Sequence, residues 1–247
     1  MTAPGPAPRR SLRRSVELLA AFRTEQADPD GFYGMLSADA VALLGTRVPL
    51  AGSRALDVGG GAGYLTAALR SAGARCVLVD ADAGELAWRG APSPCSVLAD
   101  GTRLPVPDGA ADLVVSSNVL EHVATPFALL DEMARVLRPG GHLWLSFTTW
   151  LGPWGGHETS PWHLLGGERA CRRYERRTGR PPKNRYGESL FPLHVGPFLR
   201  RLARTPALEL LDARPRYLPA GTGPLVHVPV LRELCTWNLE VLARRRG

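Results

Sequence analysis

Four glycines in five residues, at positions 59–63, lie between an apolar run at 55–58 and a helix-like run that begins at Tyr64. Glycine adopts positive φ and lets the backbone approach a ligand closely, whereas a turn without a ligand gains nothing from so many flexible residues. The first turn of a helix also presents unpaired backbone N–H groups that bind polar groups. A strand, this turn and a helix in succession therefore predict a cofactor-binding loop.

Strand-like and helix-like runs alternate along residues 54–148. The predicted strands cover residues 55–58, 76–80, 95–98, 112–117 and 142–148, and the predicted helices cover 64–72, 85–89 and 126–137. This alternation is typical of βαβ units with a parallel sheet. The strands are continuously apolar, which predicts a sheet covered on both faces. Farther along, we expect a helix at 195–204, a strand at 208–218, a helix at 226–234 and a final strand at 236–242.

The spacing of the glycines argues against two common nucleotide-binding loops. A Gly-x-Gly-x-x-Gly dinucleotide pattern that starts at Gly59 would need glycine where Tyr64 stands, and one that starts at Gly60 fails at Ala62. A nicotinamide-dependent oxidoreductase is therefore disfavoured. No Lys-Ser or Lys-Thr pair follows the glycines, as a phosphate-binding P-loop requires. The pattern that the sequence does show is Asp57-x-Gly59-x-Gly61-x-Gly63.

This pattern resembles motif I of the class I S-adenosylmethionine (SAM)-dependent methyltransferases, and the later motifs of that family follow in order. The resemblance implies SAM as the cofactor. It implies that Gly59, Gly61 and Gly63 form the floor under the methionine and ribose parts of SAM. It also implies that Asp57 contacts the methionine ammonium group through water.

Residues after the next strands complete the implied cofactor site. Asp80 ends the second predicted strand and would accept both ribose hydroxyls, because a carboxylate is a bidentate acceptor for a diol. Ala81 follows it and is included among the cofactor-binding residues. The resemblance implies that Asp100 accepts the adenine amino group, with Gly101 as its backbone neighbour. Asn118 lies in the stretch that resembles the family's loop under the methionine.

The resemblance covers roughly residues 50–148 and implies a Rossmann-like α/β fold. The expected sheet has seven strands, mostly parallel with the last one antiparallel, with helices on both faces and an insertion after strand five. The last hundred residues resemble uncharacterised actinobacterial members of the group, which supply no substrate. We expect a disordered tail at 1–10 and one domain at 11–247, with N-terminal helices at 11–48, the first of them reaching about residue 26, a SAM-binding core at 50–148 and a substrate-side insertion at 150–190.

Two histidines are candidates for a general base, which helps methyl transfer if the acceptor is a hydroxyl. His157 follows the fifth strand on a glycine-rich loop that can come near the methyl group, and Glu158 could orient it. His122 is the second candidate because it lies close to the expected cofactor. Loop capping and ordinary packing are the alternatives for these residues. The spacing of His157, Glu158 and His163 is not diagnostic of a metal site, so we expect no metal.

Charge is unevenly placed along the 247 residues. Residues 1–147 hold 13 basic and 15 acidic residues, a net charge of −2, whereas residues 148–247 hold 17 and 8, a net charge of +9. The second half could meet an anionic substrate, an anionic membrane surface or nucleic acid, but we favour a solvated basic face. The four cysteines show no CxxC spacing, and no signal peptide or bilayer-spanning run is recognisable, so we expect a cytoplasmic protein.

The predicted function is SAM-dependent methyl transfer to an O, N or C atom of a small-molecule or lipid-like acceptor. The chain lacks the Asn/Asp-Pro-Pro-Tyr/Phe motif of the enzymes that methylate amino groups of DNA bases, and it lacks a Pro-Cys nucleophile for cytosine C5. Nucleic acid is therefore a less favoured substrate. The alternatives are an RNA methyltransferase, which the basic second half would suit, and a non-catalytic SAM-binding protein.

Overall fold

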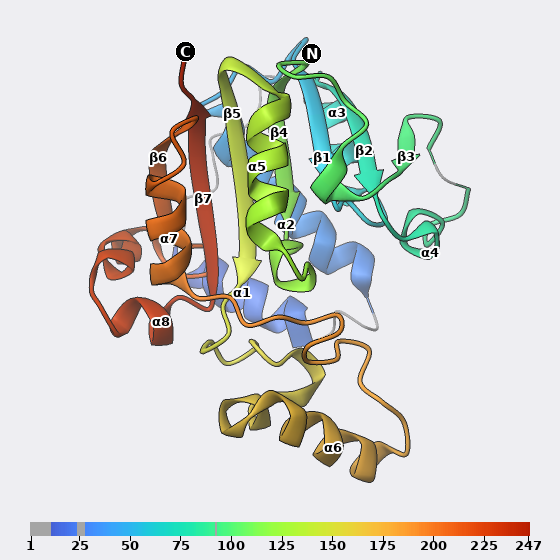
Figure 1. Ribbon diagram of the computed structural model, residues 1–247, viewed down its shortest axis with the longest axis vertical. Helices are drawn as coiled ribbons and strands as arrows, with labels where there is room; N and C mark the ends of the chain where they lie inside the picture. Colours follow the sequence, from blue (N-terminus) through green and yellow to red (C-terminus); the bar gives the residue numbers. More distant parts are fainter. Residues whose placement is uncertain (1–10, 24–27, 92) are drawn as a thin grey trace.

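The computed structural model describes residues 11–23, 28–91 and 93–247. The predicted tail at 1–10 and the predicted end of the first helix near residue 26 lie outside the described residues. Within these ranges the chain forms a seven-stranded sheet with helices on both faces (Figure 1).

The strands lie in the order β3-β2-β1-β4-β5-β7-β6. β7 runs antiparallel to β5 and β6, and the other neighbouring strands are parallel. This arrangement confirms the predicted sheet. The strand bounds are β1 (Arg54–Val58), β2 (Arg75–Asp80), β3 (Ser96–Leu98), β4 (Ala111–Ser117), β5 (Leu137–Thr148), β6 (Leu208–Pro215) and β7 (Asn238–Arg245).

The strand order reverses between β1 and β4. From β1 the chain builds outward to β2 and β3, and it then crosses back to place β4 on the other side of β1. Because these strands are parallel, the loops after β1, β2 and β4 leave the same edge of the sheet. Ligands of open α/β sheets bind outside the carboxyl ends of the strands at such a reversal. The glycine loop after β1 therefore lies at the edge where a ligand is expected.

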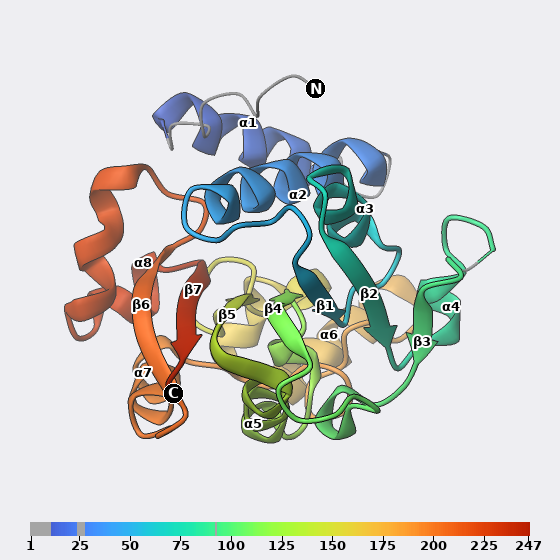
Figure 2. The same cartoon turned by 90° about the horizontal axis from the view of Figure 1, so that it is seen from above.

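Helices pack against both faces of the sheet. Figure 2 shows α1, α2 and α3 on one face and α5 and α7 on the other. The helix bounds are α1 (Leu12–Arg23), α2 (Pro29–Gly45), α3 (Tyr64–Ser71), α4 (Ala83–Leu86), α5 (Pro126–Val136), α6 (Gly167–Thr178), α7 (Val195–Ala203) and α8 (Leu231–Cys235).

Successive residues of β4 show why the strands carry no polar alternation. Val114 belongs to the core cluster that includes Leu129 of α5 and Phe198 of α7. Leu113 and Val115 belong to the cluster on the α2 and α3 side. All three β4 residues are completely buried, so each face of the strand supplies its own core.

Several predicted boundaries differ from the structure, each for a local reason. The helix expected at 226–234 is a 3-10 helix, Ala220–His227, followed by the short α8. Pro229 lies between them, and its ring and missing N–H interrupt an α-helix. The helix expected at 85–89 is α4, which begins earlier because the Asp82 side chain caps it by accepting from the N–H groups of Gly84 and Glu85.

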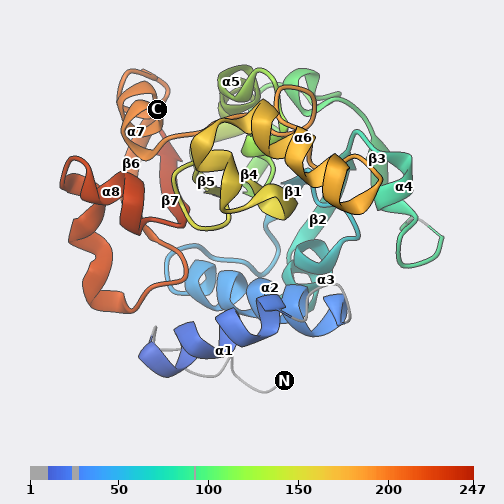
Figure 3. The ribbon, with the colours of Figure 1, turned by 90° about the horizontal axis from the view of Figure 1, so that it is seen from below.

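The segment between β5 and α7 lies across the carboxyl ends of the strands (Figures 1 and 3). It contains two 3-10 turns, His157–Thr159 and Trp162–Leu165, and then α6. Its far end is held by the Phe191 N–H, which donates to the Glu121 carbonyl oxygen at 2.8 Å. The insertion therefore covers the edge where the glycine loop lies.

A search of the described residues finds no helix with both the length and the apolar character needed to cross a membrane.

Candidate active site

The glycine loop connects β1 to α3 through three residues with positive φ: Gly59 at +72°, Gly61 at +51° and Gly63 at +81°. Gly59 lies against the loop after β4, and a Cβ added to it would be 2.4 Å from Val119 Cγ2. A side chain at this position would therefore clash as well as strain the backbone. The loop thus presents bare backbone beside the loop after β4, as a cofactor floor requires.

Asp80 and the glycine loop meet at the carboxyl end of β2. The Gly61 N–H donates to Asp80 Oδ2 at 2.8 Å, and the Asp82 N–H donates to Oδ1 at 2.9 Å. The half-buried carboxylate is thereby fixed beside the loop, where it can accept from a diol. Ala81 follows at an exposed bend.

Asp57 lies beneath the glycine loop, with 1% of its surface exposed. The Thr66 hydroxyl of α3 donates to Asp57 Oδ2 at 2.7 Å. Burial raises the pKa of the Asp57 carboxyl to about 6. The hydrogen bond from Thr66 lowers this pKa, but its effect is smaller than that of burial. A Cβ at Gly60 would be 2.7 Å from Asp57 Oδ2, so the loop packs directly on this carboxyl. Sequence reasoning gave Gly60 no role of its own.

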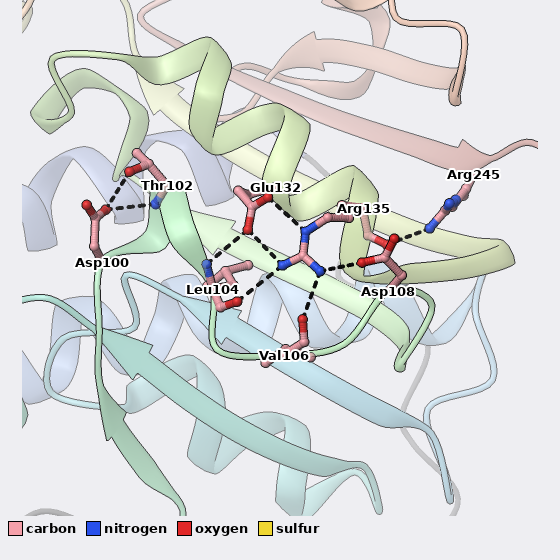
Figure 4. A network of polar contacts seen from close by, with 8 residues as sticks. All are labelled: Asp100, Thr102, Leu104, Val106, Asp108, Glu132, Arg135 and Arg245. Atoms are coloured by element: carbon pink, nitrogen blue, oxygen red, sulfur yellow. Dashed lines mark hydrogen bonds and ion pairs between the residues drawn. The ribbon is translucent and has the colours of Figure 1, made fainter.

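Asp100 lies at the end of β3 and begins a 3-10 turn, Gly101–Arg103. Its Oδ1 accepts from both the N–H and the hydroxyl of Thr102 at 2.8 Å (Figure 4). These hydrogen bonds lower the pKa of Asp100. A Cβ at Gly101 would be 2.9 Å from Leu129 Cδ1, so only glycine lets this turn pack so closely on α5. Asp100 and Asp80 therefore follow adjacent strands at one edge of the sheet.

Asn118 follows β4 with φ of +57°, a conformation that asparagine tolerates better than most residues. Its side-chain oxygen accepts from Asn238 Nδ2 at 2.8 Å, and its backbone N–H donates to the Ser146 carbonyl oxygen at 2.8 Å. The side chain thus ties the loop after β4 to β7.

His122 and His157 are brought together although 35 positions separate them. Their rings pack edge to face with centroids 5.0 Å apart. His122 Nδ1 lies 2.8 Å from the Ser189 carbonyl oxygen, so Nδ1 carries the hydrogen and Nε2 carries the lone pair. Burial, and secondly the neighbouring His122, lower the pKa of His157 to about 4. Both predicted base candidates therefore lie together, where the insertion meets the loop after β4.

Glu121 is the acidic neighbour that sequence reasoning missed. Its side chain is 1% exposed, and its Oε1 accepts from the Thr148 N–H at 2.8 Å. The carboxylate, His122 and His157 offer one ligand atom each within 4.8 Å of one another. The one available signal was its place directly before His122 in the loop after β4.

Glu158 and His163 have other partners. Glu158 Oε1 accepts from Asn184 Nδ2 at 2.9 Å, so this carboxylate holds the insertion together. His163 Nε2 lies 2.9 Å from the Trp150 carbonyl oxygen, and its ring packs edge to face on the Trp150 ring. These contacts stabilise the folded insertion. Because its hydrogen-bond partner is Asn184, Glu158 does not orient His157.

A cavity of about 240 Å³ lies between the α1 and α2 helices and the β6–β7 end of the sheet. Leu18, Leu36 and Leu43 line its apolar side. Arg216 also lines it, and Arg216 Nη1 donates to Ser117 Oγ at 3.0 Å and to Ser146 Oγ at 2.8 Å. Ser117 is the last residue of β4, so this hydrogen bond joins the cavity wall to the strand that leads into the loop beside Gly59.

Comparisons with known proteins agree with this geometry. Residues 56–145 match a family model described as a methyltransferase domain. An uncharacterised methyltransferase of Mycolicibacterium vanbaalenii is 48% identical over 246 residues, which is 96% of this chain and 96% of that protein. The relationship thus extends beyond the cofactor half to the insertion and the C-terminal strands.

Solved structures share the fold at lower identity. A SAM-dependent methyltransferase from Mesorhizobium loti superposes with a TM-score of 0.59 at 22% identity, covering 85% of this chain and 98% of that one. The [4+2]-cyclase SpnF superposes with a TM-score of 0.53 at 19% identity, covering 85% and 82%. At these low identities, the solved structures show only that the fold is shared. The 48% identity over nearly the whole chain shows common ancestry with the Mycolicibacterium protein. The chain therefore belongs to the methyltransferase family that includes the Mycolicibacterium vanbaalenii protein.

Proposed function

We propose that this methyltransferase transfers the methyl group of SAM to an O, N or C atom of a small-molecule or lipid-like acceptor. The observation that carries the proposal is the cavity between α1, α2 and the β6–β7 end of the sheet. It has an apolar wall, and Arg216 in its lining donates a hydrogen bond to Ser117 at the end of β4.

The residues present fit the cofactor. Gly61 leaves open space, because the nearest atom to a Cβ added there would be Glu85 Oε2 at 3.8 Å, and the Asp80 carboxylate accepts from the Gly61 N–H. In the proposed complex Asp80 holds the ribose, Asp100 holds the adenine amino group, and the loops around Gly59 and Asn118 lie along the methionine part. SAM supplies a methyl group on a sulfonium, which is an excellent leaving group.

The chain's own task is alignment, exclusion of water and removal of a proton where the acceptor carries one. His122 is suited to accept that proton because its Nδ1 hydrogen is engaged with Ser189 and its Nε2 carries the lone pair. His157 is neutral near pH 7, since its pKa lies at about 4. The insertion covers the edge and supports water exclusion. The proposal includes a cytoplasmic location, because all four cysteines are free thiols.

Transfer of label from SAM carrying a radioactive methyl group tests the proposal. A bacterial extract is separated into lipid, small-metabolite and RNA fractions, and each is incubated with the protein. We expect label in the lipid or small-metabolite fraction. Label in RNA would contradict the proposed acceptor class, and no label in any fraction with a SAM-binding protein would favour the non-catalytic alternative.

A pair of matched variants tests the cavity itself. Leu43→Trp places an indole where the cavity lies, whereas Leu12→Trp adds the same group on α1 at a position that is 70% exposed. We expect Leu43→Trp to keep SAM binding and to lose at least about tenfold in transfer, with Leu12→Trp unchanged. If the two variants transfer the methyl group equally well, the cavity is not the acceptor site.

A further inference from the structure

We propose that Glu121, His122 and His157 bind a divalent transition-metal ion of the Zn²⁺ type. The three side chains converge from two distant segments, the loop after β4 and the insertion after β5. One ligand atom from each lies within 4.8 Å of the other two. Metal binding is measured without SAM or acceptor, so it does not depend on the proposed function.

Two atoms of the cluster are buried without a partner. Glu121 Oε2 and His157 Nδ1 find no hydrogen-bond partner among the residues that the structure describes. An unpaired buried carboxylate oxygen is costly, and proteins pair such groups or use them to coordinate metals. A cation between these two atoms would satisfy both at once.

The remaining atoms of the cluster are held as metal ligands are usually held. Ligating histidines commonly donate their other ring N–H to a backbone carbonyl, and ligating carboxylates are themselves hydrogen-bonded. His122 Nδ1 pairs with the Ser189 carbonyl oxygen at 2.8 Å, which directs Nε2 to the cluster as the second nitrogen. Glu121 Oε1 accepts from the Thr148 N–H at 2.8 Å, which leaves Oε2 for the ion.

The backbone of His157 adopts an uncommon conformation, which brings its side chain to the cluster with Glu121 and His122. Its φ is +48°, in the left-handed region that residues with a Cβ seldom adopt. Its N–H donates to the Trp154 carbonyl oxygen at 2.8 Å, which holds the turn. The ring of His157 packs edge to face on the His122 ring, with centroids 5.0 Å apart, so the turn brings the two imidazoles together.

The ligand types decide the class of ion. Two imidazoles and one carboxylate suit Zn²⁺, Co²⁺ or Fe²⁺, whereas Mg²⁺ and Ca²⁺ prefer oxygen ligands. Ligand atoms around tetrahedral Zn²⁺ lie about 3.3 Å apart, so these side chains close by roughly 1.5 Å when the ion binds. Three protein ligands leave one position open, as in catalytic zinc sites.

Titration with Co²⁺ tests the proposal, because Co²⁺ reports its coordination by visible absorption and Zn²⁺ displaces it. The protein is purified without a polyhistidine tag. We expect one equivalent of Co²⁺, displaced by one equivalent of Zn²⁺. Glu121→Gln and His157→Ala should each weaken binding at least about 100-fold, since each removes a ligand. His142→Ala, which removes a histidine in the middle of β5, outside the cluster, should bind as the wild type does.

Folding is followed separately by circular dichroism in the absence of metal. Glu121→Gln should remain folded, because glutamine keeps the side-chain volume and its amide oxygen can still accept from the Thr148 N–H. Absence of saturable binding by the wild-type protein, or undiminished one-equivalent binding by both folded variants, would overturn the proposal.

Discussion

At the scale of single residues, the Asp57 carboxyl is buried beneath the glycine loop and accepts a hydrogen bond from Thr66. Its pKa is raised from 3.8 to about 6, so between about pH 4 and 6 the folded protein holds a proton that the unfolded chain has released. Stability from this group is therefore lost as pH rises through that window, by about 3 kcal/mol in total.

Asp57→Asn tests this linkage because asparagine has nearly the same shape and no charge. The free energy of unfolding of the variant minus that of the wild type should rise by about 3 kcal/mol from pH 4 to pH 7. Urea denaturation at several pH values measures both proteins. Parallel pH profiles would show that Asp57 is already ionised in the folded protein at pH 4.

Gly59 combines a positive φ with a close neighbour. Gly59→Ala should destabilise the protein by about 1–2 kcal/mol through the backbone and by about 1–3 kcal/mol more through the clash with Val119. Gly52→Ala is the matched control, since Gly52 has a φ of +78° and nothing within 4 Å of its would-be Cβ. Adding Val119→Ala to Gly59→Ala should recover the stability that is lost through the clash. If the double variant is as destabilised as Gly59→Ala alone, the clash with Val119 does not contribute.

At the scale of elements, Arg135 of α5 fastens the loop between β3 and β4 to the helix (Figure 4). Its guanidinium donates to the carbonyl oxygens of Leu104 and Val106 and to the carboxylates of Glu132 and Asp108. The Glu132 carboxylate in turn accepts from the Leu104 N–H. One side chain thus positions the segment that follows the Asp100 turn.

Arg135→Met keeps much of the aliphatic stem and removes the charge. Because Arg135 is partly exposed, we expect a loss of only about 2 kcal/mol in the free energy of unfolding. Arg13→Met removes an exposed pair with Glu17 and should cost less than about 0.5 kcal/mol. Denaturant titration of both variants measures the difference, and equal losses would mean that the network around Arg135 adds nothing.

Local sequence patterns predict much of this fold. The glycine spacing and the continuously apolar strands depend on neighbours in the chain, so β1, β2 and β4 fall within a residue of their predicted bounds. The prediction of one helix at 226–234 is wrong, because Pro229 separates the 3-10 helix Ala220–His227 from α8.

The cluster of Glu121 with His157 could not be predicted in this way. It depends on how the insertion crosses the strand ends, and no local pattern records that path. The contact of Arg216 with Ser117 spans 99 positions and likewise follows from the strand order.

At the scale of the whole molecule, the basic second half is carried by several elements and is interspersed with acidic partners. Arg201 pairs with Asp131, and Arg244 pairs with Glu209. On α6, Arg173 lies over the Trp162 ring, with its Cζ 3.9 Å from the centroid. This distribution supports the interpretation of a solvated basic face.

Calorimetric titration with SAM tests the central claim most directly, because the proposed function places SAM at the edge where β1, β2 and β4 end. The wild-type protein should bind one equivalent of SAM and no NADH. Asp80→Ala should lose at least about 100-fold in affinity, since it removes two charged hydrogen bonds. Asp82→Ala should bind nearly as the wild type does, because it removes the cap of α4 and leaves the Asp80 carboxylate in place. A folded wild-type protein that binds NADH in place of SAM, or an Asp80→Ala variant with unaltered SAM affinity, would contradict the account.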